Sequence, residues 1–436
     1  MSLEQTFRNP WWVVFGSTLA LMVGNAPVLF FTFGVFLKPI TSEFGWNRGT
    51  MSAALTAYVI LGAMGTPFAG KLVDRWGVRR VTLAFIAAFS LATAALSQTP
   101  SYPLAFLLLY AVCGLVGSGQ APLPYAKAIS ARFEARRGLA LGIAMAGVGL
   151  GTALMPQLAR VLIQAFGWRG AYIGLGIVTF AVAFPGVLLF VRGPAASGRR
   201  EFPTAGGRPR EALVASGMTM SQALKTSYQF WLLAIATFLV SAATNGTIAH
   251  IVPLLTDRGL SNQLATLVLT SAGLAMIGGR ILSGYLVDRF FAPYVAACFF
   301  LLPLVGILFL GVGWAGVVPL LGAICVGLGL GAVIALTAFL IGRYFGLRAF
   351  GEMYGYVMAV FLFGSGLGPW LMGVCFDVTR SYNLALTGFA LLLVIASLLI
   401  SRLGPYIYPA SRVMAKPEMS DVTADAPLAA LKNPTK

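Results

Sequence analysis

Two short stretches of the chain, Gly70-Lys71-Leu72-Val73-Asp74-Arg75 and Gly284-Tyr285-Leu286-Val287-Asp288-Arg289, each follow a long apolar run. They begin 214 residues apart and are identical at five of six positions. Each places an acidic residue and a basic residue side by side where an apolar segment ends. The recurrence indicates that the chain is built from two related halves.

A second pair of positions supports this duplication. Gly142 and Pro156 recur as Gly355 and Pro369, at an offset of 213. Two independent matches at nearly the same offset favour duplication over coincidence. Parallel repeats of six helices are typical of membrane transporters in which one half rocks against the other around a site at the middle of the bilayer.

The composition shows which solvent these halves occupy. Of 436 residues, 58% are hydrophobic and 10% are charged. Soluble domains carry about a quarter charged residues, and a bilayer-spanning helix needs about 20 apolar residues, so the apolar content suffices for roughly twelve spans. This composition excludes a soluble enzyme, a disulfide scaffold and an outer-membrane barrel. It predicts an all-α, multi-pass membrane protein.

The apolar runs predict twelve transmembrane helices in two pseudo-symmetric six-helix bundles. We expect one bundle within residues 1–191 and the other within 228–404, joined by a polar cytoplasmic linker at 192–227 and followed by a cytoplasmic tail at 405–436. The predicted helices cover residues 11–37, 50–70, 79–98, 103–127, 138–163, 170–191, 228–255, 263–286, 291–313, 316–342, 351–375 and 383–403.

The loop charges predict the orientation. Sorted by side of the membrane, 22 Lys and Arg residues fall on the side of the two termini and 5 on the opposite side, with 3 inside spans. Cationic loops stay in the cytoplasm, so both termini should be cytoplasmic and the protein should lie in the plasma (inner) membrane. The net charge of +17 is explained by these loops, and we expect no nucleic-acid partner.

The first repeated stretch extends to Gly70-x-Leu72-x-Asp74-Arg75-x-Gly77-x-Arg79-Arg80. In this form it resembles the loop between helices 2 and 3 of the major facilitator superfamily, and the resemblance covers about residues 11–404. Asp74 could cap a neighbouring helix or pair with the loop arginines until rocking breaks the contact. The resemblance implies a gating role for Asp74, Arg75, Arg79, Asp288, Arg289 and Arg136.

A narrower resemblance rests on Phe33-Gly34-Val35-Phe36-Leu37-Lys38-Pro39, on Glu43-Phe44-Gly45-Trp46-Asn47-Arg48, on Phe166-Gly167-Trp168-Arg169 and on Gly279-Arg280. Together they are similar to the oxalate/formate antiporter and monocarboxylate transporter branch. Aromatic helix ends followed by Gly-Trp also suit any membrane interface. The resemblance implies that a helix 8 arginine binds a substrate carboxylate.

The residues themselves also single out Arg280. It lies eight residues before Asp288, which at 1.5 Å per residue places it about 12 Å into a hydrocarbon core whose half-thickness is about 15 Å. Its repeat-mate is Thr66, so the shared scaffold does not require the charge. A guanidinium matches a carboxylate with two parallel hydrogen bonds. Alternatively, Arg280 snorkels to the surface or bonds a backbone carbonyl.

His250 is the chain's single histidine, and it precedes Asp257 by two helical turns, so the two residues share a helix face. Either could carry a coupling proton, and His250 could also contact substrate. The alternatives are a hydrogen-bonded packing role for His250 and an interfacial position beside Arg258 for Asp257.

Four further polar residues, each equally suited to bridging helices, could contact substrate: Asn25, Gln120, Tyr125 and Asn245. Residues 351–375 contain no Lys or Arg, whereas family members that exchange dicarboxylates carry a second embedded cation there. Lys38 falls at the outer end of helix 1, so the helix 1 lysine of proton-linked lactate carriers has no counterpart. These departures favour a monoanion as the substrate and make His250 and Asp257 the candidates for carrying the coupling proton.

The sequence therefore predicts a secondary active transporter of a small organic monocarboxylate, lactate-like or aromatic, that is proton-coupled and works by alternating access. The alternatives are an anion antiporter of the oxalate/formate type and a drug or solute exporter of the same fold. An intramembrane enzyme would need converging acid, base or metal ligands, so we expect no catalytic residue, metal or cofactor. The expected partners are a small carboxylate anion, a proton and the lipid bilayer, and the expected state is a monomer.

Overall fold

The computed structural model describes residues 9–130, 132–133, 136–191, 217–312, 316–346 and 348–408. Their regular secondary structure is helical apart from one isolated bridge between Gly217 and Gly346. Most of the predicted linker and tail lie outside the described residues.

The first half of the chain forms a bundle that we call the N-bundle. Its elements are α2 (Trp11–Met22), η1 (Ala26–Phe30), α3 (Phe33–Phe44), α4 (Arg48–Trp76), α5 (Val78–Ala95), η2 (Leu96–Gln98), α6 (Pro103–Gly117), η3 (Ser118–Gln120), α7 (Pro122–Ser130) and α8 (Arg137–Phe190).

The second half forms the C-bundle. Its elements are α10 (Met220–Thr226), α11 (Tyr228–Asp257), α12 (Asn262–Val287), α13 (Ala292–Val312), α14 (Val318–Phe345), α15 (Phe350–Thr379) and α16 (Asn383–Ser401). The short helix α10 begins with a capping box formed by Thr219 and Gln222. It occupies part of the segment predicted to be linker.

Eleven segments of the described chain are long and apolar enough to cross a membrane. One of them, Leu139–Phe190, has 52 residues and is therefore long enough for two spans. It turns at Gly167, whose φ of 68° and ψ of 175° lie outside the helical region. Counting this hairpin as two helices gives twelve spans, six in each bundle, which confirms the predicted fold class.

Two helices predicted as continuous are broken. The first span passes through a π-helical turn at η1, where Pro27 lacks an N–H and the Asn25 side chain accepts a hydrogen bond from Ala26 N at 2.8 Å. The fourth span breaks at Ala121, whose ψ of 160° is the extended conformation favoured before a proline. Both breaks interrupt the regular hydrogen bonding of a span between its two ends.

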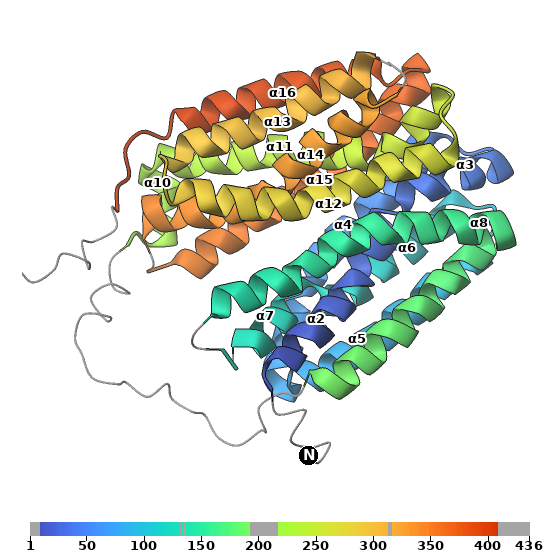
Figure 1. The fold of residues 1–436 in the computed structure, drawn as a ribbon, viewed down its shortest axis with the longest axis horizontal. Coiled ribbons are helices and arrows are strands. Elements are labelled where there is room, and N and C mark those ends of the chain that lie inside the picture. The colour runs from blue at the N-terminus through green and yellow to red at the C-terminus, as the bar shows by residue number, and fades with distance from the viewer. Residues whose placement is uncertain are drawn as a thin grey trace, which may run out of the picture.

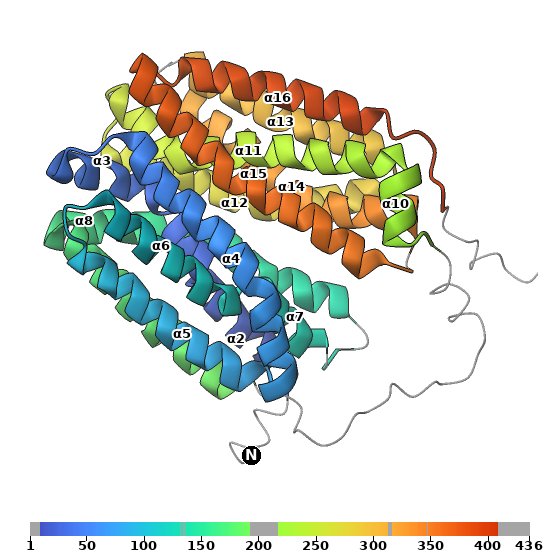
Figure 2. The ribbon, with the colours of Figure 1, turned by 180° about the vertical axis from the view of Figure 1, so that it is seen from behind.

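The two bundles pack side by side, as Figures 1 and 2 show from opposite faces. We call the end where α2 begins and α16 ends the terminal end, and the end with the turns at Gly45, Gly167 and Gly259 the distal end. In Figure 1 the bundles converge toward the distal end, near α3, and diverge toward the terminal end, near α10.

The seam between the bundles is tight from its middle to the distal end. The Thr270 hydroxyl donates to Ala153 O at 2.8 Å, and the Thr56 hydroxyl donates to Gly366 O at 2.7 Å. A Cβ atom at Gly273 would lie 2.7 Å from Ala153 N. Toward the terminal end, a Cβ atom would meet nothing within 4 Å at Gly142, Gly284, Gly351 or Gly355. The structure is thus closed at the distal end and splayed at the terminal end.

Gly114 and Gly142 give a matched test of helix packing. A Cβ atom at Gly114 would overlap the Tyr58 carbonyl of the neighbouring helix, whereas Gly142 faces open space. We expect Gly114→Ala to destabilise the protein by about 1–3 kcal/mol through overpacking. Gly142→Ala should stabilise it by about 0.5–1 kcal/mol, because alanine is the better helix former. Thermal unfolding of the two purified variants measures the difference. Equal melting temperatures would contradict the helix contact described here.

Candidate functional site

Arg280 lies on α12 and reaches across the seam. Its Nη1 donates to the carbonyl oxygen of Met145, on α8 of the N-bundle, at 2.9 Å. Among the inter-bundle hydrogen bonds of the described residues, this one lies nearest the terminal end. Arg280 is seven residues from the end of α12, a rise of about 11 Å, so it stands well inside the span.

Among the residues that the structure describes, Arg280 has no acidic partner. None of the four ion pairs found among the described residues involves it. Tyr354 of α15 is close enough to interact with it electrostatically. A guanidinium has five N–H groups, and a single backbone carbonyl cannot satisfy them. Arg280 therefore has N–H groups left to donate and a charge without a counter-ion. Its bond to a backbone carbonyl is the alternative role that the sequence analysis gave.

The other residues predicted to contact substrate lie in different environments. Asn25 is half-buried at the break in the first span and packs against Gly117 of α6. Tyr125 is fully buried in α7, and its hydroxyl has no hydrogen-bond partner. Asn245 is buried in α11 and donates from Nδ2 to Ser241 O of its own helix at 3.0 Å.

Gln120 is fully buried in η3, and its Nε2 donates to Phe85 O of α5 at 3.4 Å. Its Oε1 has no hydrogen-bond partner among the described residues. That Gln120 contacts substrate stays a prediction. Glycine and proline break the helix here, and the amide packs inside the N-bundle.

His250 is fully buried and joins α11 to three other segments. Nε2 lies 3.0 Å from Pro369 O of α15 and 3.1 Å from the Ser52 hydroxyl of α4, and Nδ1 lies 3.2 Å from the Tyr382 hydroxyl. Pro369 and Tyr382 belong to the C-bundle, as His250 does, so of these three contacts the one with Ser52 crosses the seam. That His250 contacts substrate stays a prediction.

The partners of His250 define its tautomer. A carbonyl oxygen only accepts, so Nε2 must carry the proton that it donates to Pro369 O. In the neutral ring, Nδ1 then accepts from the Tyr382 hydroxyl, whose oxygen in turn accepts from Arg48 Nη1. The hydrogen bonds run in one direction from Arg48 through Tyr382 and His250 to Pro369.

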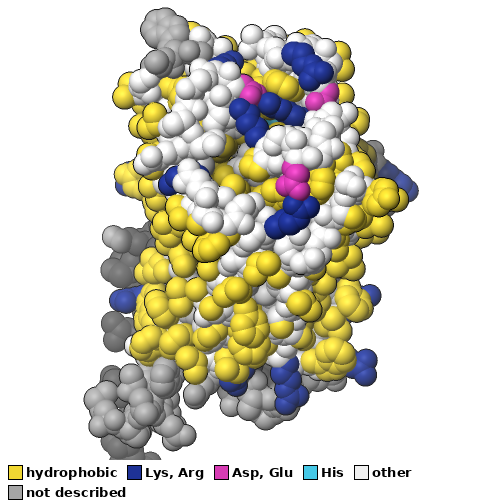
Figure 3. All heavy atoms as spheres, turned by 90° about the vertical axis from the view of Figure 1, so that its right-hand side faces the viewer, with side chains coloured by type: hydrophobic (Ala, Val, Ile, Leu, Met, Phe, Trp, Pro, Cys, Tyr) yellow, Lys and Arg dark blue, Asp and Glu magenta, His cyan; other side chains and the backbone are white. Residues whose placement is uncertain are grey.

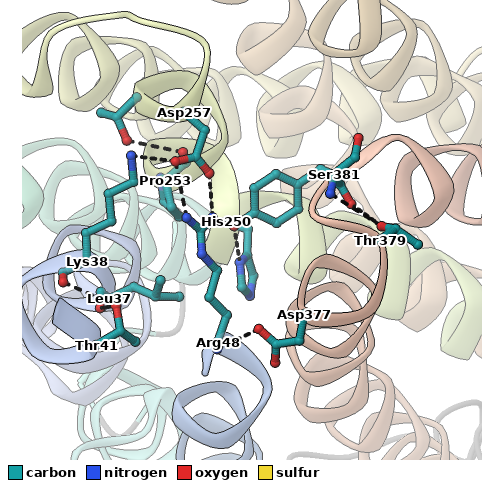
Figure 4. Close-up of polar contacts among 12 residues, drawn as sticks. Leu37, Lys38, Thr41, Arg48, His250, Pro253, Asp257, Asp377, Thr379 and Ser381 are labelled. Atoms are coloured by element: carbon teal, nitrogen blue, oxygen red, sulfur yellow. Dashed lines mark hydrogen bonds and ion pairs between the residues drawn. The ribbon is translucent and has the colours of Figure 1, made fainter. Parts of the chain in front are cut away.

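Asp257 is held by cations of the N-bundle. Arg48 donates to its two carboxylate oxygens at 2.5 and 3.1 Å, and Lys38 Nζ lies 2.7 Å from Oδ1. Figure 4 shows Lys38 and Arg48 converging on this carboxylate above His250. The Arg48 guanidinium also lies 3.6 Å from the centroid of the Phe376 ring.

A second carboxylate of the C-bundle also reaches the N-bundle. Asp377 of α15 accepts from the backbone N–H groups of Arg48 at 2.9 Å and Gly49 at 2.6 Å, at the first turn of α4. It therefore caps a helix of the other bundle and meets the positive end of that helix dipole. We call the set Lys38, Arg48, Asp257, Asp377 and Tyr382 the distal gate.

The residues predicted to gate the terminal end make contacts inside single bundles in this conformation. Asp74 pairs with Lys127 of α7, not with the loop arginines as expected. Arg79 donates to Leu188 O at 2.5 Å, and Arg75 lies over the Trp76 ring.

The other three predicted gating residues lie at helix ends. Arg289 lies over the Tyr285 ring, Asp288 is the C-cap of α12, and Arg136 precedes α8 with a φ of 61°. None of these contacts joins the two bundles, because their terminal ends are splayed.

The sequence reasoning missed most of the distal gate. The sequence places Lys38 at a helix end and Arg48 in a stretch with a family resemblance, and it assigns no role to Asp377 or Tyr382. Arg48 and Asp377 are separated by 329 positions in the chain. A single sequence contains no signal for such a pairing; only the position of Asn47 and Arg48 at a helix start could have suggested that a carboxylate caps it.

Comparisons with known proteins agree with this architecture. The family profile described as Major Facilitator Superfamily matches residues 19–369. Human monocarboxylate transporter 11 is 28% identical over 414 residues, which cover 91% of this chain and 82% of that protein. The uncharacterized MFS-type transporter YcxA of Bacillus subtilis (strain 168) is 25% identical over 378 residues, which cover 81% of this chain and 85% of that protein.

Solved structures share the fold at low sequence identity. A bacterial homologue of the human lysosomal transporter Spinster, in an inward-facing and unoccupied conformation, superposes with a TM-score of 0.69 and 19% identity over 91% of this chain and 97% of that one. The D323A mutant of the nucleoside transporter NupG gives a TM-score of 0.72 and 12% identity over 90% and 99% of the two chains. The chain therefore belongs to the Major Facilitator Superfamily and is a multi-pass membrane transporter, not an enzyme.

Proposed function

We propose that this transporter carries a small organic monocarboxylate, together with a proton, by alternating access. The observation that carries the proposal is Arg280, a cation inside a span with one carbonyl partner and no acidic one. A buried cation without a counter-ion is costly, and a carboxylate would satisfy it with two parallel hydrogen bonds. Likeness over most of the chain to a protein named monocarboxylate transporter 11 supports the same cargo.

A single charge on the substrate follows from the charge of the site. Residues 351–375 contain no Lys or Arg, so α15 offers Arg280 a tyrosine, Tyr354, and no second cation. A dicarboxylate would bring one negative charge more than the site neutralises. Asn25, half-buried at the break in the first span, stays a weaker candidate to contact substrate.

The proposed orientation puts the terminal end in the cytoplasm of the plasma (inner) membrane, where the cation-rich loops belong. The structure then corresponds to an inward-facing state, with Arg280 nearest the open end and the distal gate closed toward the outside. Outward opening requires Asp257 to leave Lys38 and Arg48, Tyr382 to leave Arg48, and His250 to leave Ser52.

We assign proton coupling to His250 and Asp257 because the contacts of the closed gate require a neutral His250 and an ionised Asp257. In the closed gate, His250 must be neutral because Nδ1 accepts from Tyr382, and an added proton there would face an O–H donor and the nearby Arg48 cation. When the gate opens, Asp257 loses both cations, and a proton can replace them. The gate thus binds a proton only when it is open, which links proton uptake to outward exposure.

The central test replaces Arg280. Arg280→Ala should lower carboxylate uptake into proteoliposomes by about 100-fold or more, which corresponds to about 3 kcal/mol of charged hydrogen bonding. Arg280→Lys should keep a small part of the activity because it retains the charge without the planar fork. Size-exclusion profile and melting temperature control for folding. Full uptake by Arg280→Ala would remove the assignment.

The proton assignment has its own test. His250→Gln can still donate to Pro369 O and accept from Tyr382 but cannot carry a proton. Under an inward proton gradient, we expect this variant and Asp257→Asn to lose accumulation against a substrate gradient, while exchange of labelled substrate at equal concentrations stays within about threefold of wild type. Undiminished accumulation in both variants would contradict proton coupling through these residues.

The gate is tested by distance measurement. Spin labels at Phe166 and Val378, which are 70% and 79% exposed on the two bundles at the distal end, report its opening in a variant whose native cysteines are replaced. Arg48→Ala should shift the distance distribution toward longer separations because it removes the guanidinium that binds Asp257 and Tyr382. The matched control is Arg169→Ala, which breaks the Arg169–Glu43 pair inside the N-bundle and should leave the distribution unchanged. Identical distributions in both variants would contradict the gate.

A further inference from the structure

Six cations lie at the distal end of the described chain, and two of them are fully engaged elsewhere. Arg169 pairs with Glu43 inside the N-bundle. Arg258 donates to the carbonyl oxygens of Leu310 and Gly311 and to the Asn383 side chain. The remaining four cations are Lys38, Arg48, Arg160 and Arg380.

These four cations line one cavity. Its volume is about 490 Å³, within the range of small-molecule sites, and its walls come from both bundles. Trp46 and Asp377 belong to the same lining. Figure 3, which looks onto the distal end, shows cationic and acidic side chains gathered around a hollow. We call this cavity the distal vestibule.

The vestibule has more positive than negative charge. Asp257 is shared between Lys38 and Arg48, and Asp377 is used by the first turn of α4. Arg160 donates only to the amide oxygens of Gln157 and Gln164, at 3.4 and 3.0 Å. Among the described residues, no ion pair involves Arg160 or Arg380.

The backbone at Arg380 adds a second observation. This residue ends α15 with a φ of 54°, in the left-handed region. Glycine adopts that conformation without cost, whereas another residue loses about 1–2 kcal/mol. An arginine nevertheless occupies the position, and its side chain is exposed at the rim of the vestibule.

The vestibule is distinct from the site at Arg280. Arg160 and Met145, the partner of Arg280, both lie on the first arm of α8 and are 15 residues apart, a rise of about 22 Å. Lys38 and Arg48 of the distal gate line the vestibule itself and bind Asp257. An anion in the vestibule therefore cannot contact Arg280 while the gate is closed.

We propose that the distal vestibule is a second binding site for the carboxylate anion, where substrate from the outside is held above the closed gate. This inference rests on the proposed function for the identity of the anion. Cations in a cleft with low-dielectric walls focus the electrostatic potential and raise the local concentration of a small anion. Arg160 and Arg380, which lack acidic partners, supply the attraction, and opening of the gate joins the vestibule to Arg280.

Iodide quenching of Trp46 tests the site without transport. The Trp46 contribution is the difference in fluorescence between the protein and its Trp46→Phe variant, and the uncharged quencher acrylamide measures simple access. Arg160→Gln combined with Arg380→Gln should lower the iodide quenching constant of Trp46 at least twofold and leave the acrylamide constant unchanged. Acetate should protect Trp46 from iodide in the wild type. Arg169→Gln, a distal cation outside the vestibule, is the matched control.

Uptake kinetics supply the second readout. For influx from the distal side, the double variant should raise KM about threefold with kcat little changed. A variant cannot change the equilibrium of transport, so kcat/KM from the terminal side must fall by the same factor; we expect this fall in kcat, with KM from the terminal side at the wild-type value. A purely structural role would alter KM on both sides. Unchanged iodide quenching, lack of protection by acetate or an unchanged influx KM would each overturn the vestibule site. Failure of the proposed function is separate, since it would appear as full carboxylate uptake by Arg280→Ala.

Discussion

The closed distal end depends on the contact between Arg48 and Asp257. Arg48 comes from the first turn of α4, and Asp257 ends α11, so this ion pair joins the two bundles. The same guanidinium binds Tyr382 and stacks on Phe376, while its backbone N–H is capped by Asp377. Removing one member of such a cluster leaves desolvated charges without partners, so the contact is made or broken as a unit.

In the mechanism that we propose, this arrangement couples protonation of the gate to the motion of the two bundles. The hydrogen bonds from Arg48 to Pro369 require a neutral His250, and the ion pairs require an ionised Asp257. Protonation of either group is incompatible with the contacts of the closed state. A two-state element that a bound proton biases in this way is what ion-coupled transport requires. In this conformation the terminal end is splayed while the distal end is closed.

The duplication supplies the scaffold, and its departures from symmetry supply the function. The repeated Gly-x-Leu-Val-Asp-Arg stretches end equivalent spans, yet Arg280 has threonine as its repeat-mate. Because rocking requires only that the halves pack alike, one half is free to carry a charge that the other lacks. The inter-bundle contacts beside Arg280 use backbone carbonyls and small residues, which leave its guanidinium without an acidic partner.

The sequence by itself determined the fold class, the twelve spans, the internal repeat and the depth of Arg280, because hydropathy and residue spacing act locally along a helix. It also identified His250 and Asp257 as sharing one helix face. Only the tertiary structure decided their partners. Arg48 and Asp257 are 209 positions apart, and His250 of the C-bundle meets Ser52 of the N-bundle. Such contacts depend on how the two bundles tilt against each other, and that tilt is set by packing across the whole seam, which no local pattern in the chain encodes.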